Sequence, residues 1–261
     1  MKEDIDAIFE KYFPADWNIE AAHVFAAQSN FDLYNDALEE GLNKPIRDLI
    51  FRGGKRIRPL LFLTLLKSFG KDPKNYLDFA FIVELVHNGT LVVDDIEDGS
   101  DLRRGKPALH KTFGTDVALN AGVAMHILPL KLLVGRNDIS QTQRLKLFEI
   151  YTEEATNVYL GQTIDINWHN NIPPDVTESN YFEMARLKTG SLARMAVRFA
   201  ATLTEQSEEV TKALTVFAES AGIAFQIKDD ALDLTADAEE FGKPFGQDIS
   251  EGKISLPVVL A

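Results

Sequence analysis

Two short acidic clusters of matching spacing are the residues of this sequence best suited to chemistry. The stretch VVDDIEDGSDLRRG, residues 92–105, crowds Asp94, Asp95, Glu97 and Asp98 together and then turns to two arginines. The stretch FQIKDDALDL, residues 225–234, repeats the aspartate spacing. Carboxylates packed this closely repel one another unless a cation lies among them. The two stretches therefore raise the question of what positive charge they hold.

Each cluster closes a long apolar stretch that is predicted to be a helix. Asp94 and Asp98 then lie one turn apart on the face that also carries Glu84 and His87. Asp229 and Asp233 repeat this spacing, with Gln226 one turn earlier. Magnesium prefers oxygen ligands and usually keeps places for water and substrate phosphates. A solvated acidic helix end explains one such cluster, but two of them, each ending an apolar helix, favour a magnesium site that suits a diphosphate.

Basic residues beside glycines supply the complementary charge. Lysines and arginines that neighbour flexible backbone can approach an anion closely and hold a phosphate group. Each is more often a plain surface residue when taken alone, but as a set they indicate diphosphate binding. They lie in RGGKRIRP (Lys55, Arg56, Arg58), after the first cluster (Arg103, Arg104), in RLKTGS (Lys188, with Thr189) and in GKPFGQDISEGK (Lys243, Lys253).

The elements that must position these residues are helices. Apolar residues recur at three- and four-residue spacing over most of the chain, and strand-like alternation is almost absent. Glycine, proline and Asn-Asp pairs punctuate the spacing, as in Gly53-Gly54 and Asp72-Pro73. We expect one all-α domain over residues 1–261. The predicted helices are 20–42, 59–69, 75–98, 115–134, 140–168, 178–203 and 207–234.

Composition excludes several classes of function. A net charge of −13 argues against a nucleic-acid partner, because phosphate backbones are bound by basic surfaces. The 261 residues include no cysteine, so disulfides, thiolate metal sites and cysteine nucleophiles are excluded, which fits a cytoplasmic protein. No run of eighteen apolar residues occurs, so we expect no transmembrane segment.

The motifs together resemble the trans-type polyprenyl diphosphate synthases, and most of all the geranylgeranyl diphosphate synthases. The matching pieces run in the family's order from about residue 50 to the end of the chain. They are GGKRIRP (53–59), ELVHNGTLVVDDIEDGSDLRRGKPALH (84–110), GQTIDINW (161–168), KTGSL (188–192), FQIKDDALD (225–233) and GKPFGQDISEGKISLP (242–257). The resemblance implies the isoprenoid synthase fold, with long antiparallel helices around a central cavity, and a homodimer. The family continues for several helices beyond KISLP, so we expect the chain to be truncated at its C-terminus.

The resemblance also implies a role for each motif residue. Isopentenyl diphosphate would be held by Lys55, Arg58, His87 and Arg104, and the allylic diphosphate by Arg103, Lys188, Lys243 and Lys253. Asp94 and Asp98, with Asp229 and Asp233 opposite, would bind about three magnesium ions as in the family. Thr189 and Gln226 would lie beside the developing cation, and Gln162 and Asp165 nearby. Catalysis would then depend chiefly on Asp94, Asp98, Lys188 and Asp229.

The expected product is geranylgeranyl diphosphate, with farnesyl or longer-chain diphosphates as alternatives. The positions four and five residues before the first cluster, where short-chain enzymes of the family carry aromatic residues, are Thr90 and Gly89. Small residues there would leave a tunnel open, with Met125, His126 and Tyr159 as candidates for its floor. Two other classes of protein are considered as alternatives. A terpene synthase would not need Lys55, Arg58 and His87, and a non-catalytic prenyl-diphosphate-binding subunit would not need both clusters intact.

Overall fold

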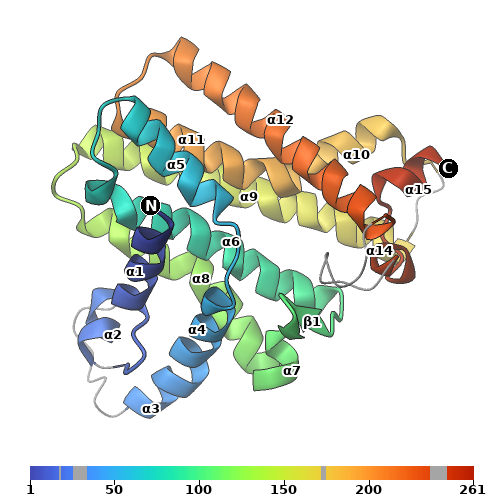
Figure 1. Ribbon diagram of the computed structural model, residues 1–261, viewed down its shortest axis with the longest axis horizontal. Helices are drawn as coiled ribbons and strands as arrows, with labels where there is room; N and C mark the ends of the chain where they lie inside the picture. Colours follow the sequence, from blue (N-terminus) through green and yellow to red (C-terminus); the bar gives the residue numbers. More distant parts are fainter. Residues whose placement is uncertain (18, 26–33, 172–174, 236–245) are drawn as a thin grey trace. The chain divides into compact units, whose positions relative to one another are not determined.

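The described residues are almost entirely helical. The computed structural model describes residues 1–17, 19–25, 34–171, 175–235 and 246–261. Within these ranges the only strands are β1 (Leu102–Arg103) and β2 (Lys106–Pro107), which pair as a short antiparallel hairpin. The all-α class predicted from the spacing of apolar residues is therefore confirmed (Figure 1).

The chain divides into two compact units. The first comprises Met1–Phe148 with Thr202–Thr204, and the second comprises Glu149–Ala201 and Glu205–Ala261. The first unit holds α1 (Lys2–Tyr12), α2 (Ile19–Phe25), α3 (Asn35–Leu38), η2 (Glu39–Asn43), α4 (Lys44–Phe51), α5 (Ile57–Ser68), η3 (Pro73–Tyr76), α6 (Leu77–Glu97), the hairpin, α7 (Leu109–Phe113), α8 (Thr115–Gly135) and the start of α9 (Gln141–Asn171). The second holds the rest of α9, then α10 (Glu178–Ala185), η4 (Arg186–Gly190), α11 (Ser191–Leu203), α12 (Glu208–Asp233), α14 (Gln247–Ser250) and α15 (Leu256–Leu260).

Most helix boundaries predicted from periodicity agree with the structure to within a few residues. The helices α1, α4, α7 and α14 were not predicted, and part of the predicted helix 20–42 lies outside the described residues. The range 178–203 is helical throughout, but η4 in its middle is a π-helix, with a wider turn than the flanking α-helices. Such turns are rare and often occur at functional sites.

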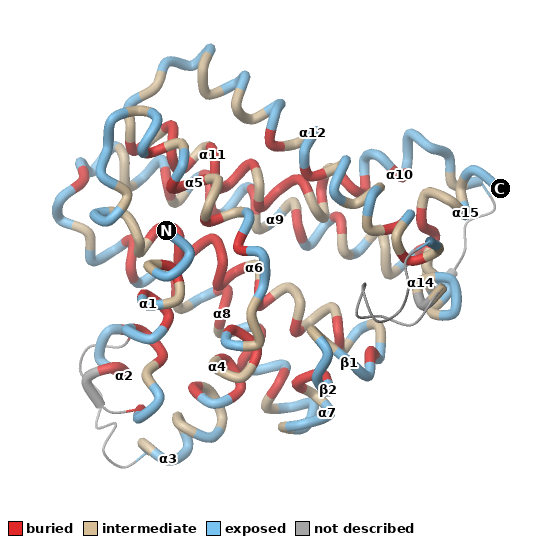
Figure 2. Tube along the Cα trace, in the orientation of Figure 1, coloured by how far each residue is buried: buried red, intermediate tan, exposed pale blue. Residues whose placement is uncertain are grey.

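The core of the first unit is the pairing of α6 with α8. Nearly every side chain in the first half of α6 is buried, including Phe79 and Phe81 (Figure 2). The two helices approach closely at glycines: a Cβ on Gly89 would lie 2.8–2.9 Å from atoms of α8, and Gly122 on α8 packs against Val92. Burial of each large apolar side chain stabilises the fold by about 1.5–3 kcal/mol. This packing fixes the C-terminal end of α6, which carries the first acidic cluster.

Two helices are long and apolar enough to cross a membrane by length and composition alone, Pro73–Glu97 and Thr115–Gly135. They were not expected from the sequence because isolated polar residues, such as Glu84 and His126, interrupt their apolar runs. They contain the α6 and α8 segments that pack on each other, and Glu84 is buried with a charged partner, Arg56. Core helices of water-soluble proteins have the same composition, and the burial of α6 identifies it as such a helix.

The second unit is built around η4, which lies against both α9 and α12. A Cβ on Gly161 of α9 would lie 2.3 Å from the backbone nitrogen of Lys188, and one on Gly222 of α12 would lie 2.7 Å from the Cα of Gly190. Only glycine permits backbones to approach this closely. The π-helical turn that carries Lys188 and Thr189 is thus held between two glycines from other helices.

Candidate functional site

The predicted site residues are distributed over both units. The first unit contains Lys55, Arg58, His87, Asp94, Asp98, Arg103 and Arg104. The second contains Lys188, Thr189, Gln226, Asp229, Asp233 and Lys253. Lys243 lies outside the described residues.

The first acidic cluster ends α6. Asp94 and Asp98 are half-buried, whereas Asp95, between them in sequence, is buried and accepts a hydrogen bond from Arg103 Nε at 2.8 Å. The C-terminal end of a helix carries partial negative charge, so carboxylates there are unfavourable unless a cation is near. Asp94 and Asp98 therefore offer carboxylate oxygens, one helical turn apart, to a hard divalent cation.

Arg103 supplies part of that positive charge from the β1–β2 hairpin. Its guanidinium binds Asp95 and lies 3.6 Å from Asp94. Burial raises the pKa of Asp95, although the hydrogen bond and charge of Arg103 oppose the shift. Burial alone would lower the pKa of Arg103, but the bond to Asp95 and the neighbouring carboxylates raise it overall. Arg103 thus remains charged and joins the acidic cluster to the turn that follows.

A basic group lies beside this cluster. Burial lowers the pKa of His87 well below its usual value, and the positive charges of Arg58 and Arg104 lower it further. The pKa of Arg104 falls to about 10, because of burial first and then the neighbouring charge of Arg56. The positive charges of Arg58 and Arg104 thus lie close enough to His87 to add to the effect of burial. A bound anion would stabilise these charges.

The glycine-rich turn before α5 shapes this group. The backbone of Arg56 is left-handed (φ 51°), and its side chain is buried against Glu84 at 2.8 Å, so Arg56 is structural. Lys55 beside it is exposed. Gly54 has φ 141°, and a Cβ there would lie 3.4 Å from the guanidinium of Arg104, which also donates to the carbonyl of Leu49. Glycine at position 54 thus makes room for Arg104.

In the second unit, η4 presents two polar side chains to partners on neighbouring helices. Lys188 forms an ion pair with Asp165 of α9. The hydroxyl of Thr189 donates to Gln226 Oε1 of α12 at 2.6 Å, and Gln226 Nε2 donates to Asp230 at 2.9 Å. This hydrogen bond joins Thr189 and Gln226, the two residues that the family resemblance predicts to lie beside the developing cation.

The second acidic cluster uses its carboxylates differently. Asp230 is buried and accepts hydrogen bonds from the Tyr181 hydroxyl at 2.7 Å and from the backbone N–H of Leu256 at 2.9 Å. Asp233 is also buried, and its carboxylate accepts the backbone N–H of Asp248 at 3.3–3.4 Å. Asp229 is half-buried. Lys253, in the chain's last segment, forms an ion pair with Glu251 at 3.2 Å.

Carboxylate oxygens at the ends of α6 and α12 fit a magnesium ion by their chemistry. Across the described ranges, however, no three His, Cys, Asp or Glu side chains are grouped closely enough to hold a metal within one cluster. Exposure and spacing favour Asp94 and Asp98 as metal ligands. Water or phosphate oxygens would then supply most of the remaining ligands of the ion.

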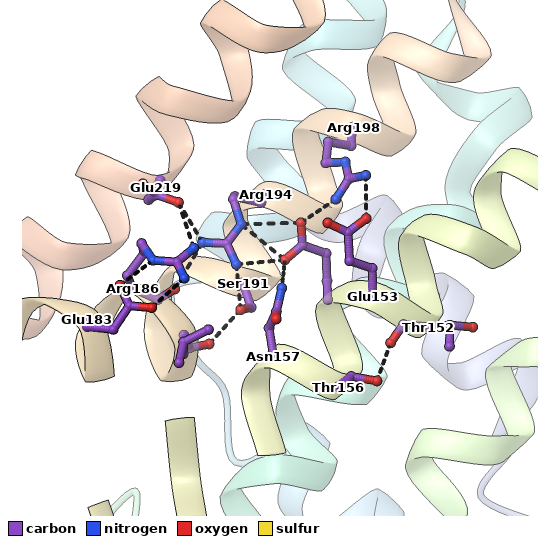
Figure 3. A network of polar contacts seen from close by, with 12 residues as sticks. Thr152, Glu153, Thr156, Asn157, Glu183, Arg186, Ser191, Arg194, Arg198 and Glu219 are labelled. Carbon is purple, nitrogen blue, oxygen red and sulfur yellow. Dashed lines mark hydrogen bonds and ion pairs between the residues drawn. The ribbon is translucent and has the colours of Figure 1, made fainter. Parts of the chain in front are cut away.

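Several residues of these networks were missed by sequence reasoning. Tyr181, the hydrogen-bond donor to Asp230, has no distinguishing sequence context. A buried ion-pair network centred on Arg194 and Glu154 was also missed (Figure 3). Arg194 and Arg198, four residues apart, resemble an ordinary solvated helix face, so only the structure reveals that Arg194 and Glu154 are buried.

Comparisons with known proteins identify the family of the chain. The sequence profile of the polyprenyl synthetase family matches residues 39–261. The chain is 37% identical over 222 residues to the geranylgeranyl diphosphate synthase of Methanosarcina mazei, covering 85% of this chain and 68% of that protein. It also resembles the crystal structure of geranylgeranyl pyrophosphate synthetase from Pyrococcus horikoshii, with a TM-score of 0.79 and 32% identity over 99% of this chain and 75% of that one.

One further matching structure was solved with bound ligands. The geranyltransferase from Helicobacter pylori, complexed with magnesium and isoprenyl diphosphate, matches with a TM-score of 0.78 and 25% identity over 99% of this chain and 82% of that one. The isoprenoid synthase fold predicted from the motifs is thereby confirmed. Taken with the match over residues 39–261, these similarities establish that the chain belongs to the polyprenyl synthetase family and is a prenyltransferase.

Proposed function

We propose that this prenyltransferase condenses isopentenyl diphosphate with an allylic prenyl diphosphate, releases pyrophosphate, and forms mainly geranylgeranyl diphosphate. The observation that carries the proposal is the grouping of Arg58 and Arg104 around His87, apart from the carboxylates of the two acidic clusters. An enzyme that only ionises an allylic diphosphate has one diphosphate to hold. An enzyme that extends the chain has two, and the basic group suits the second.

Two sets of basic residues would bind the two diphosphates. Lys55, Arg58, His87 and Arg104 would bind isopentenyl diphosphate. Arg103, Lys188, Lys243 and Lys253 would bind the allylic diphosphate. We propose that residues 1–261 act in this way as one prenyl-transfer domain.

Magnesium ions, about three in number, would be held by Asp94 and Asp98 from α6 and by Asp229 and Asp233 from α12. When bound, magnesium would stabilise the negative charge that develops on the departing diphosphate. The burial of Asp233 against Asp248 leaves Asp229 as the more accessible carboxylate of the second cluster. We therefore assign the larger share of metal binding in α12 to Asp229.

The chain's own side chains would stabilise the rest of the reaction. Lysine and arginine donors aimed at the leaving diphosphate lower the barrier to its departure. The Thr189 hydroxyl donates a hydrogen bond to Gln226 Oε1, so its oxygen keeps lone pairs that can face the allylic cation. The proton lost after the carbon–carbon bond forms can pass to the released pyrophosphate. No side-chain base is then required.

The product assignment rests on the relatives' names and on the LRRG and DINW pieces rather than on Gly89. That residue faces α8, where a Cβ would meet His126, Met125 and the carbonyl of Gly122 within 2.9 Å. Its small size serves the packing of α6 on α8, so the interpretation of Gly89 as an opening of the tunnel is wrong. Met125 and His126 are buried in the same contact.

We further propose that the enzyme is a cytoplasmic homodimer. The absence of cysteine suits a reducing compartment. A stripe on α8 supports self-association, because Leu119, Val123, Ile127 and Val134 are 43–62% exposed. Contiguous exposed apolar surface of this kind is typical of a protein–protein interface.

A product assay tests the proposal. The purified protein is incubated with magnesium, isopentenyl diphosphate and, in separate reactions, dimethylallyl, geranyl or farnesyl diphosphate, and the products are sized by mass spectrometry. We expect a twenty-carbon diphosphate to dominate. A fifteen-carbon or longer main product would overturn the product assignment alone. Binding of prenyl diphosphates without any condensation would identify a non-catalytic subunit, and cyclised hydrocarbons would identify a terpene synthase.

A further inference from the structure

The π-helical turn η4 is held by a buried arginine that none of the substrate-binding motifs contains. Arg194, on the first turns of α11, is 4% exposed, and its guanidinium lies beside η4 (Figure 3). Its Nη1 donates to the backbone carbonyl of Arg186 at 2.9 Å, and a Cβ on Gly190 would lie 3.2 Å from the same atom. Arg194 therefore bonds the first residue of the five-residue turn and fills the space that a side chain at its last residue would need.

A second contact runs through Ser191. Arg194 Nη2 donates to Ser191 Oγ at 2.8 Å, and that hydroxyl donates to the carbonyl of Leu187 at 2.5 Å. A π-helical turn leaves backbone carbonyls outside the regular α-helical ladder, and each needs a donor when buried. Arg194 and Ser191 supply donors to two consecutive carbonyls, those of Arg186 and Leu187.

The guanidinium is itself fixed by acids on two other helices. Glu154 of α9 is fully buried and accepts from both Nε and Nη2 of Arg194, and Glu219 of α12 accepts from Nη1 at 2.9 Å. Burying charges in this way costs free energy unless the geometry satisfies nearly every donor. The planar guanidinium of Arg194 thus joins α9, η4 and α12. Its several N–H donors in fixed directions make this possible, whereas the single ammonium group of lysine would not.

We propose that Arg194 is a positioning residue that fixes the conformation of η4 and thereby the placement of the Lys188 ammonium and the Thr189 hydroxyl. The inference rests on the proposed function of these two residues toward the allylic diphosphate. Arg194 bonds the carbonyl of Arg186 directly and that of Leu187 through Ser191, and these are the two residues before Lys188. Loss of these bonds lets the turn relax toward α-helical geometry, in which successive residues rotate by about 100°.

The chain offers a matched control in the same network. Arg198 is one helical turn further along α11 and also binds Glu154, through Nη1 at 2.6 Å, but its Nη2 donates to Glu153 of α9 instead of to η4. Arg194→Lys and Arg198→Lys therefore make the same chemical change against the same buried glutamate. Only the first removes donors from the π-helical turn.

The experiment compares steady-state kinetics and amide hydrogen exchange of the two variants. For Arg194→Lys we expect KM for the allylic substrate to rise at least tenfold, KM for isopentenyl diphosphate to change less than twofold, and exchange in residues 186–191 to accelerate at least tenfold. For Arg198→Lys each quantity should change less than twofold. A lower melting temperature for Arg194→Lys, with KM and exchange both unchanged, would overturn the proposal.

A double variant covers the case in which Arg194→Lys fails to fold. Glu154→Gln with Arg194→Met removes both buried charges together and still removes the donor to the Arg186 carbonyl, so the same acceleration of exchange is expected. Unchanged exchange in the folded double variant would count against Arg194. Exchange is measured without substrate, so it tests the positioning role even if the wild-type protein fails to condense prenyl diphosphates. That failure would contradict the proposed function instead.

Discussion

The acidic clusters that end α6 and α12 have the same aspartate spacing but different surroundings. At the end of α6, Asp94 and Asp98 are half-buried, and the middle residue, Asp95, is buried and bonded to Arg103. At the end of α12, both Asp230 and Asp233 are buried and bonded to the protein. Equal spacing therefore does not mean equal availability, and the first cluster offers two accessible carboxylates where the second offers one.

The neighbouring positive charges differ in the same way. Beside α6, the positive charges of Arg58 and Arg104 add to burial in lowering the pKa of His87. Beside α12, Lys188 is paired with Asp165. A diphosphate at Lys188 would therefore have to compete with an internal carboxylate. Four variants break or sharpen this contrast.

The largest effect is expected for Asp94→Ala. As a proposed ligand of the metal, Asp94 would contribute to the transition state more than to the fold, so we expect kcat to fall by about 10²–10³-fold, the cost of removing one electrostatic stabiliser. The free energy of unfolding should change by less than about 1 kcal/mol, as for a partly exposed ion pair, since Asp94 lies 3.6 Å from Arg103. Steady-state kinetics and urea denaturation measure the two quantities. Loss of stability comparable to the loss of activity would contradict the comparison.

Asp230→Ala should reduce the stability of the fold more than the activity. It leaves the Tyr181 hydroxyl and the Leu256 N–H without their acceptor, so we expect the free energy of unfolding to fall by about 2–3 kcal/mol, as for hydrogen bonds to a charged group. Urea denaturation measures the change. Tyr181→Phe is the control, because it removes only one of these bonds and should cost about 1 kcal/mol. An Asp230→Ala protein as stable as wild type would show that the cluster is not built into the fold.

Gly161→Ala tests the close contact that positions Lys188. Because the added Cβ would lie 2.3 Å from a backbone nitrogen, the helices must move apart, and we expect a loss of about 1–3 kcal/mol in unfolding free energy, as for overpacking. Thermal or urea unfolding measures it. Gly41→Ala is the control, since no described atom outside its own helix lies within 4 Å of a Cβ placed there and a slight gain is expected. Equal stability of the Gly161→Ala and Gly41→Ala proteins would contradict this prediction.

The smallest effect concerns pH. Because the pKa of folded His87 is depressed, the unfolded chain binds a proton near pH 6.5 that the folded chain does not, and stability falls as pH decreases below that value. In His87→Gln this contribution disappears, so the slope of unfolding free energy below pH 6 should be shallower by up to about 1.4 kcal/mol per pH unit. Identical slopes for both proteins would mean that His87 is protonated in the fold. Added pyrophosphate should also flatten the wild-type slope.

The sequence predicts the helices well, because periodicity is a local property. The roles of the site residues stay predictions, and the hydrogen bond between Thr189 and Gln226 emerges only in the structure. The sequence cannot predict which acids are buried by distant residues, and so the bonding of Asp230 to Tyr181 was not foreseen. Gly89 was misinterpreted for the same reason: a small residue is compatible with open space or close packing, and only the position of α8 decides between them.

The clamping of η4 between two glycines has a consequence for the order in which the chain acquires its structure during synthesis. Gly161 precedes the turn, but Gly222 follows it, with all of α11 in between. Ribosomal synthesis proceeds from the N-terminus, so the turn that carries Lys188 leaves the ribosome well before its second support exists. The turn therefore stays incomplete until α12 emerges, whereas residues 1–148, which make up most of the first unit, have been synthesised before the turn itself.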